Sequence, residues 1–273
     1  IISLWKLPLL IVCENNQYAQ STHFTDNLAG DIIKRASAFS INTFESDTWD
    51  AEKLFANAKE SIAYVRKEKK PAFHLVDTYR LNAHSKGDDD RDDKEIKNYE
   101  AKDFLVKFKK EDPIIYNKYL KEINAKVEAV VNSSIDSDEL SIEGYYLDNE
   151  HAKKEKNWTP VVEIKERQVS LINNFFDKIL NEDNKVIFIG EDVKSPYGGA
   201  FKVANKLSDK YPNQVFTTPI SEAAITGIGN GLALSGFKPF IEIMFGDFVT
   251  LAFDQIINHA SKIFNMYNKK VST

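Results

Sequence analysis

The sequence predicts an α/β protein with two parallel sheets, on the strength of three observations. Short apolar runs ending in polar residues recur along the chain, as in LLIVCENN, AFHLVDTY and KVIFIGED. Such runs are typical of strands buried on both faces of a parallel sheet. Segments with the spacing of amphipathic helices alternate with them, which favours parallel strand pairing. A highly charged stretch separates two such α/β halves.

In the first half, a strand begins near Leu7, a helix is expected over residues 28–39, and the short strand INTFES follows. A longer helix is expected from the Asp47–Thr48 cap to about Glu68. Its predicted apolar stripe consists of Leu54, Phe55, Ala58, Ile62 and Val65. The strand AFHLVDTY comes after Pro71.

The middle of the chain is unusually charged, with 18 charged residues between Lys86 and Asp112. We expect an amphipathic helix over residues 112–131, followed by a polar, irregular stretch to Pro160. The predicted domains are therefore residues 1–100, a charged and partly helical connector over residues 101–164, and residues 165–273.

The second half repeats the alternation of helices and strands. Its expected elements are the helix VSLINNFFDKIL, the strand KVIFIGED, the glycine-rich turn SPYGGAF, the helix FKVANKLSDKY, the strand VFTTPI, the helix SEAAITGIGNGLALSG, the strand PFIEIMF and the helix DFVTLAFDQIINHASKIF. The segment GIGNG does not fit a dinucleotide-binding motif, because Leu232 stands where that motif needs a third glycine. Its small residues are expected to let helices approach closely.

Composition narrows the functional classes. A net charge of −5 gives no basic footprint for nucleic acid, and no apolar run is long enough to predict a membrane span. Cys13, the single cysteine, excludes an internal disulfide and is expected to be a buried, inert thiol. We expect a cytoplasmic protein that binds neither nucleic acid nor membrane. Because the chain starts at Ile1, within a structured pattern, we also expect a piece of a longer polypeptide.

The segment CENNQYAQST follows the first strand, at the edge where open parallel sheets bind ligands. The Asn16 amide oxygen and the Tyr18 carbonyl oxygen could face one point, and oxygen ligands of this kind suit Mg²⁺. The alternative is an asparagine-rich turn that satisfies only its own backbone.

Two long stretches resemble one enzyme family. LWKLPLLIVCENNQYAQST and VDTYRLNAHSKGDD are similar to the carboxyl-terminal half of the alpha subunit of thiamine-diphosphate-dependent 2-oxo acid dehydrogenases. GEDVKSPYGGAFKV, TTPISEAAITGIGNGLALSG and EIMFGDFVTLAFDQIINHASK resemble the start of the beta subunit. The order matches a fused alpha–beta chain. The resemblance implies two thiamine-diphosphate-binding-type half-domains and oxidative decarboxylation of a 2-oxo acid, with branched-chain substrates favoured over pyruvate or acetoin.

The resemblance also assigns roles to residues near the cofactor. Asn16 and the Tyr18 carbonyl would bind Mg²⁺, and Arg80 would lie near the diphosphate. The family's glycine between the two metal ligands is Gln17 here, a costly change if the position needs a positive φ. The family's upstream Gly-Asp-Gly element is missing, so we expect these residues alone to be nearly inactive.

Glu222 matches the catalytic glutamate that hydrogen-bonds the aminopyrimidine ring and favours its imino tautomer. The alternative role is a glutamate stabilising the first turn of a helix. Phe248 matches the aromatic residue that packs against the same ring, where the alternative is a core phenylalanine.

In the loop LNAHSKGDDDRDD, His84 matches a catalytic histidine on the acyl-transfer path, and Ser85 a position phosphorylated in some relatives. Asp88 matches an acid that holds the loop, while the other acids are expected to form a solvated face. His74 and His259 are expected to be structural.

The implied cofactors are thiamine diphosphate and Mg²⁺. The implied partners are a lipoyl-bearing acyltransferase and, in the full-length protein, a second copy of the chain. Two alternatives remain open at this point: a transketolase-like enzyme of the same fold, and a non-catalytic fragment that only assembles or binds a partner.

Overall fold

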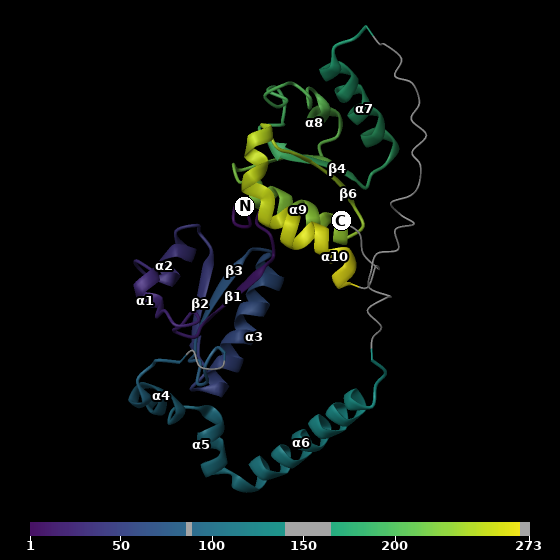
Figure 1. Ribbon diagram of the computed structural model, residues 1–273. Helices are drawn as coiled ribbons and strands as arrows, with labels where there is room; N and C mark the ends of the chain where they lie inside the picture. The colour runs from purple at the N-terminus through teal and green to yellow at the C-terminus, as the bar shows by residue number, and fades with distance from the viewer. Residues whose placement is uncertain (86–88, 140–164, 268–273) are drawn as a thin grey trace. The chain divides into compact units, whose positions relative to one another are not determined.

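The computed structural model describes residues 1–85, 89–139 and 165–267. The chain divides into two compact units, residues 1–154 and 155–273, each built on a three-stranded parallel sheet (Figure 1). The predicted α/β class is therefore correct. Across the described ranges, no helix is long and apolar enough to cross a membrane.

The sheet of the first unit has the order β1-β3-β2, with β1 at Leu10–Asn15, β2 at Asn42–Asp47 and β3 at Ala72–Asp77. Both pairings are parallel. The central strand β3 is mostly buried, but β1 lies at an edge and exposes Val12. The prediction that β1 is buried on both faces is thus wrong, because an edge strand is covered less completely than a central one.

Two helices connect these strands from opposite faces of the sheet, α2 (Ile32–Ser37) and α3 (Ala51–Glu68) (Figure 1). Opposite faces follow from the strand order, because right-handed crossovers running in opposite directions place their helices on opposite sides. Helix α2 is shorter than the predicted residues 28–39. Gly30 has a φ of +83° and Asp31 caps the helix, so the helix cannot start earlier. The short α1 (Phe24–Asn27) was not predicted.

Helix α3 begins after Asp50, whose carboxylate accepts a hydrogen bond from the Lys53 amide at 2.9 Å. The predicted cap at Asp47–Thr48 is wrong, because the Asp47 carboxylate instead accepts from the Trp49 and Asp50 amides in the preceding turn. Only part of the predicted apolar stripe is core: Val65 is buried, whereas Phe55 is exposed.

The charged stretch folds into helices, namely α4 (Asp93–Glu100), α5 (Phe104–Glu111) and α6 (Pro113–Ile135). An aspartate caps each of them: Asp92, Asp103 and Asp112. Helix α6 extends past the predicted residues 112–131, and its apolar side chains are exposed rather than buried. Residues 140–164 of the predicted connector lie outside the described residues.

The sheet of the second unit has the order β5-β4-β6, with β4 at Val186–Glu191, β5 at Val215–Thr218 and β6 at Lys238–Glu242. Every residue of the central strand β4 is buried. Figure 1 shows α7 (Gln168–Glu182) and α8 (Leu207–Lys210) on one side of this sheet and α9 (Glu222–Leu234) on the other. The core between α7 and the sheet includes Phe176, Leu180, Val186, Phe188, Val193, Ala204, Leu207 and Val215.

Two predicted helices of this unit differ from the structure. Of FKVANKLSDKY only α8 is helical, because Lys202 and Lys206 adopt positive φ angles of 64° and 61°. The predicted last helix is divided into a 3₁₀ segment, η3 (Gly246–Ala252), a π-helical segment, η4 (Gln255–Ala260), and α10 (Ser261–Met266). Hydrophobic periodicity does not distinguish these helix types.

The small residues of GIGNG permit a close approach to a helix, as predicted, and also to a strand. A Cβ placed on Gly227 in α9 would lie 3.0 Å from the Gln255 Oε1 atom of η4. A Cβ placed on Gly229 in α9 would lie 2.5 Å from the Ile241 Cδ1 atom of β6. Gly231, two residues further along the same helix, has no atom within 4 Å of such a Cβ. Gly229 therefore fixes how closely α9 packs on the sheet.

We expect Gly229→Ala to lower the free energy of unfolding by about 1–3 kcal/mol, because the added methyl group overpacks against Ile241. Urea unfolding followed by circular dichroism measures this. Gly231→Ala is the matched control and should be neutral or stabilising by up to about 1 kcal/mol, since alanine favours helix. Equal effects of the two substitutions would contradict the packing explanation.

Candidate functional site

In the first unit, the loops that follow β1 and β3 are tied together at the carboxyl ends of the strands. The Asn15 amide donates a hydrogen bond to the Asp77 carboxylate at 3.0 Å, and the Thr78 backbone N–H donates to the Asn15 carbonyl at the same distance. The predicted metal-binding turn and the predicted histidine loop therefore start from one edge of the sheet.

Asn16 uses its side chain within the turn, because its Oδ1 accepts a hydrogen bond from the Tyr18 N–H at 3.1 Å. This is the self-satisfying turn that the sequence left open as an alternative. Within the described ranges the Tyr18 carbonyl accepts no hydrogen bond. Asn16 Oδ1 has a second lone pair, so the two oxygens fit two positions of a Mg²⁺ shell that water and phosphate would complete.

Gln17 has a φ of +73°, in the left-handed region where the family has glycine. The steric cost that we expected for a non-glycine residue at a positive φ is therefore present at Gln17. No group of three or more His, Cys, Asp or Glu side chains able to hold a metal occurs in the described part of the chain.

Arg80 clamps this same turn. Its guanidinium donates to the Ala19 carbonyl at 2.6 Å and to the Gln20 carbonyl at 2.8 Å. Its Nε atom is buried without a partner in the described residues. Arg80 thus holds the loop on which Tyr18 lies, and its contact with a diphosphate remains a prediction.

A second arginine, Arg91, was not predicted to take part in the site. Its side chain is 2% exposed and lies between the rings of Tyr18 and Tyr79, with the guanidinium carbon 5.3 and 5.2 Å from their centroids. Both tyrosine hydroxyls donate to the Glu95 carboxylate of α4 at 3.0 Å. Burial and the Glu95 carboxylate raise the pKa of Tyr79 to about 12, so the hydroxyl keeps its proton.

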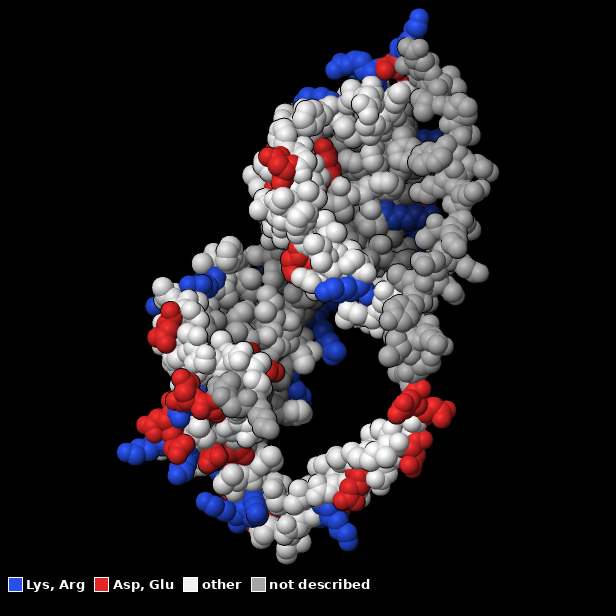
Figure 2. Space-filling model, viewed as in Figure 1, with Lys and Arg blue, Asp and Glu red and all other residues white. Residues whose placement is uncertain are grey.

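The acidic run has a structural role. The Arg91 guanidinium forms an ion pair with the Asp89 carboxylate at 2.6 Å, which lowers the pKa of this carboxyl group to about 2. Asp92 caps α4. Acidic side chains gather around α4 on the face shown in Figure 2. His84 and Ser85 are exposed in the loop that these contacts border, and Asp88 lies outside the described residues.

His74 is buried and its Nε2 atom lies 2.8 Å from the Ser46 hydroxyl, in keeping with the structural role that we predicted. Burial lowers the pKa of His74. The His259 Nε2 atom lies 3.9 Å from the Asp254 carboxylate. Cys13 is half-buried rather than fully buried, and burial raises the pKa of its thiol, which favours the unreactive form.

In the second unit, Glu222 is buried in the first turn of α9, at the carboxyl end of the sheet. The preceding Ser221 N–H donates to the Glu191 carboxylate at the end of β4, at 2.9 Å. Within the described residues the Glu222 side chain makes no hydrogen bond, so its carboxyl group is available to a ligand. Its hydrogen bond to an aminopyrimidine ring remains a prediction.

Glu242, at the end of β6, is a further acid at this edge that the sequence did not single out. Its Oε2 atom is buried without a partner in the described residues, and burial raises the pKa of this carboxyl. Gly199 makes room for it, since a Cβ there would lie 3.2 Å from Glu242 Oε1.

Phe248 lies on η3, which packs against α9. It is 37% exposed, so it is not the core phenylalanine of the alternative interpretation. Two other exposed rings, Phe245 and Phe201, were not predicted to lie with it. No sequence signal joins Phe201 to Phe245, because Phe201 lies in the loop after β4 and Phe245 lies directly before η3, far away in the chain.

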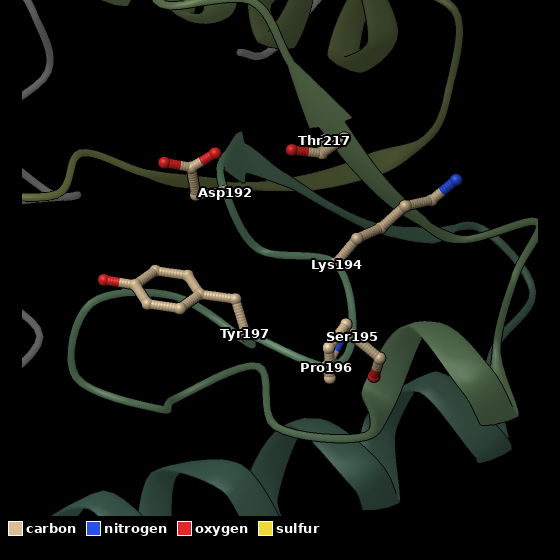
Figure 3. A pocket seen from close by; sticks show the side chains of 6 residues that line it. All are labelled: Asp192, Lys194, Ser195, Pro196, Tyr197 and Thr217. Carbon is tan, nitrogen blue, oxygen red and sulfur yellow. The ribbon is translucent and has the colours of Figure 1, made fainter.

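A shallow pocket of about 360 Å³ opens at the carboxyl ends of β4 and β5 (Figure 3). Its lining residues are Asp192, Lys194, Ser195, Pro196, Tyr197 and Thr217. Figure 3 shows the acidic Asp192 and the basic Lys194 on different sides of the pocket. This edge of the second unit therefore presents both polar groups and aromatic rings.

Two family models match the chain, one in each half. The family model described as dehydrogenase E1 component matches residues 1–141, just over half of the chain. The model described as transketolase, pyrimidine binding domain, matches residues 168–266. The chain belongs to the dehydrogenase E1 component family, which confirms the resemblance to the 2-oxo acid dehydrogenases.

Individual relatives of both subunit types are similar to parts of the chain. The 2-oxoisovalerate dehydrogenase subunit beta of Dictyostelium discoideum is 45% identical over 92 residues, covering 33% of this chain and 24% of that protein. The pyruvate dehydrogenase E1 component subunit alpha of Rickettsia felis is 33% identical over 147 residues, covering 51% and 44%. The chain thus spans less than half the length of these relatives.

A solved transketolase mutant from Pichia stipitis has a similar fold, with a TM-score of 0.50 and 14% identity over 93% of this chain and 42% of that one. At this identity the likeness concerns the fold alone.

We expect Gln17→Gly to raise the free energy of unfolding of the first unit by about 1 kcal/mol, because glycine adopts the left-handed φ of this turn without steric cost. Thermal unfolding measures it. Gln20→Gly, in the same turn but without a positive φ, is the control and should destabilise by about 0.5–1 kcal/mol. A loss of stability in Gln17→Gly would show that the strain is absent.

Proposed function

We propose that the full-length protein catalyses oxidative decarboxylation of a 2-oxo acid with thiamine diphosphate and Mg²⁺, and passes the acyl group to lipoyl-lysine of an acyltransferase. The observation that carries the proposal is Glu222, buried at the start of α9 with no side-chain hydrogen bond to the described residues, together with the exposed Phe248 on the segment packed against that helix. A carboxyl group and an aromatic ring are what an aminopyrimidine needs for orientation and proton transfer.

Thiamine diphosphate, when bound, supplies the electron sink for decarboxylation. Glu222 would hold a proton at its carboxyl group and donate it to the pyrimidine nitrogen. Glu191 fixes the Ser221 backbone and so sets where the Glu222 side chain begins. Phe248 would orient the ring by stacking. In the first unit, Asn16 Oδ1 and the Tyr18 carbonyl would hold Mg²⁺ beside the diphosphate, and Arg80 holds their turn in place.

We further propose residues 1–100 as the alpha-type half-domain and residues 165–273 as the start of the beta-type domain, joined by the connector of residues 101–164. The proposed partners are a lipoyl-bearing acyltransferase and a second copy of the chain, in the cytoplasm. Branched-chain 2-oxo acids are the favoured substrates. Relatives named for pyruvate and for 2-oxoisovalerate reach the same 45% identity, so both substrate types belong in the test.

The test uses the purified full-length protein with thiamine diphosphate and Mg²⁺ present. It measures carbon dioxide release from 2-oxoisovalerate and pyruvate and, separately, transfer of a two-carbon unit from a ketose phosphate to an aldose phosphate. Release from a 2-oxo acid that depends on thiamine diphosphate supports the proposal, and the faster substrate identifies the class. Turnover of the ketose phosphate alone would point to a transketolase-like enzyme instead.

In the full-length protein, Glu222→Gln should slow deuterium exchange at the thiazolium carbon of bound thiamine diphosphate by about 10²-fold or more, because the amide keeps the shape and loses the proton. Nuclear magnetic resonance after acid quench reads this exchange. Glu166→Gln, at an exposed glutamate of the same unit, is the control and should exchange at the wild-type rate. A wild-type rate in Glu222→Gln would remove Glu222 from the mechanism.

His84→Ala should separate two activities. We expect it to lose most lipoyl-dependent acylation and to keep a larger share of decarboxylation measured with an artificial electron acceptor, because an imidazole can pass a proton as the lipoyl sulfur attacks. Both assays are run on one preparation of the variant. Parallel losses, together with weaker cofactor binding, would mean that His84 only supports the loop.

A further inference from the structure

Three phenylalanine rings are exposed together at the carboxyl edge of the second unit. Phe201 is 58% exposed, Phe245 43% and Phe248 37%. Phenylalanine side chains gain free energy when they leave water, so a group of them on one surface indicates that something else covers it. They come from two segments: Phe201 from the loop after β4, and the other two from the start of η3.

The rings form a chain of edge-to-face contacts. The centroids of Phe201 and Phe245 are 5.6 Å apart with planes at 76°, and those of Phe245 and Phe248 are 5.3 Å apart with planes at 75°. Edge-to-face packing of this kind is favourable and directional. Phe245 therefore stands between the other two rings and restricts the rotation of Phe248.

The loop that carries Phe201 is held by its own hydrogen bonds. The Gly199 N–H donates to the Asp192 carbonyl at 3.0 Å, and the Lys202 ammonium donates to the Tyr197 carbonyl at 2.6 Å. Gly199 also lets the loop pack on Glu242 at the end of β6, where any side chain would crowd the carboxyl group. Phe201 is thus presented by a fixed loop although its ring is exposed.

We propose that Phe245, supported by Phe201, is a positioning residue that presets the orientation of Phe248 for stacking on a planar heteroaromatic ring. This inference rests on the proposed function, in which that ring is the aminopyrimidine. A ring already held in its bound orientation loses less conformational freedom when the ligand binds, so the support improves affinity without touching the ligand.

The experiment measures binding of thiamine diphosphate to the full-length protein by calorimetry in the presence of Mg²⁺. We expect Phe245→Leu to weaken the affinity for thiamine diphosphate about threefold to tenfold, because this fold-change corresponds to the free energy of one aromatic pair. Phe201→Leu should weaken it less, and Phe245→Tyr, which keeps the ring, should bind as the wild type does. The affinity for inorganic pyrophosphate with Mg²⁺ should not change in any variant.

Phe237→Leu is the matched control, because Phe237 is 40% exposed and precedes β6 at its opposite end. It should bind thiamine diphosphate like the wild type. Wild-type protein that fails to bind thiamine diphosphate would overturn the proposed function together with this inference. Wild-type protein that binds, with Phe245→Leu binding equally well, would overturn the inference alone. Equal weakening of thiamine diphosphate and pyrophosphate would also overturn it, since the effect would then not concern the ring.

Discussion

Parallel strand pairing is the constraint on which both units depend. Because all strands of a parallel sheet run the same way, their carboxyl ends meet at one edge, and the polar residues that follow them gather there. Asn16 and Arg80 lie at this edge in the first unit, and Glu191, Glu222 and Glu242 lie at it in the second. The sheets bring the groups together, and the loops then need other contacts to hold them.

Side-chain contacts, rather than the backbone hydrogen bonds of the sheets, hold these loops in place. In the first unit, Arg91 lies between two tyrosine rings whose hydroxyls share Glu95, so the segment after β3, helix α4 and the turn at Tyr18 are held as one cluster. A buried guanidinium is stable there because its charge has an acidic partner, Asp89, and two aromatic faces. In the second unit, glycines 198 and 199 with positive φ shape the loop that ends at Phe201.

The sequence predicted the elements whose signals are local. Strand β4 was recognisable as a continuous apolar run, and Glu222 as an acid at a helix start within a family motif. The contacts of Arg91 could not be predicted, because Tyr18 and Glu95 are 77 residues apart and cation–π packing has no periodicity in sequence. The same holds for the pairing of Phe201 with Phe245. The 3₁₀ and π segments near the end share their apolar spacing with an α-helix, so the pattern could not separate them.

The close packing at Gly229 limits which natural variants of the protein can fold. Any single-base change of a glycine codon that yields another amino acid introduces a side chain, and the space at Gly229 is already filled by the Ile241 methyl group. Each such missense change would force the Ile241 side chain or α9 itself to shift, and Glu222 lies in the first turn of that helix. Gly231, open to solvent, can vary freely by comparison. Natural variation in this helix should therefore be uneven, with one glycine almost fixed and the other drifting.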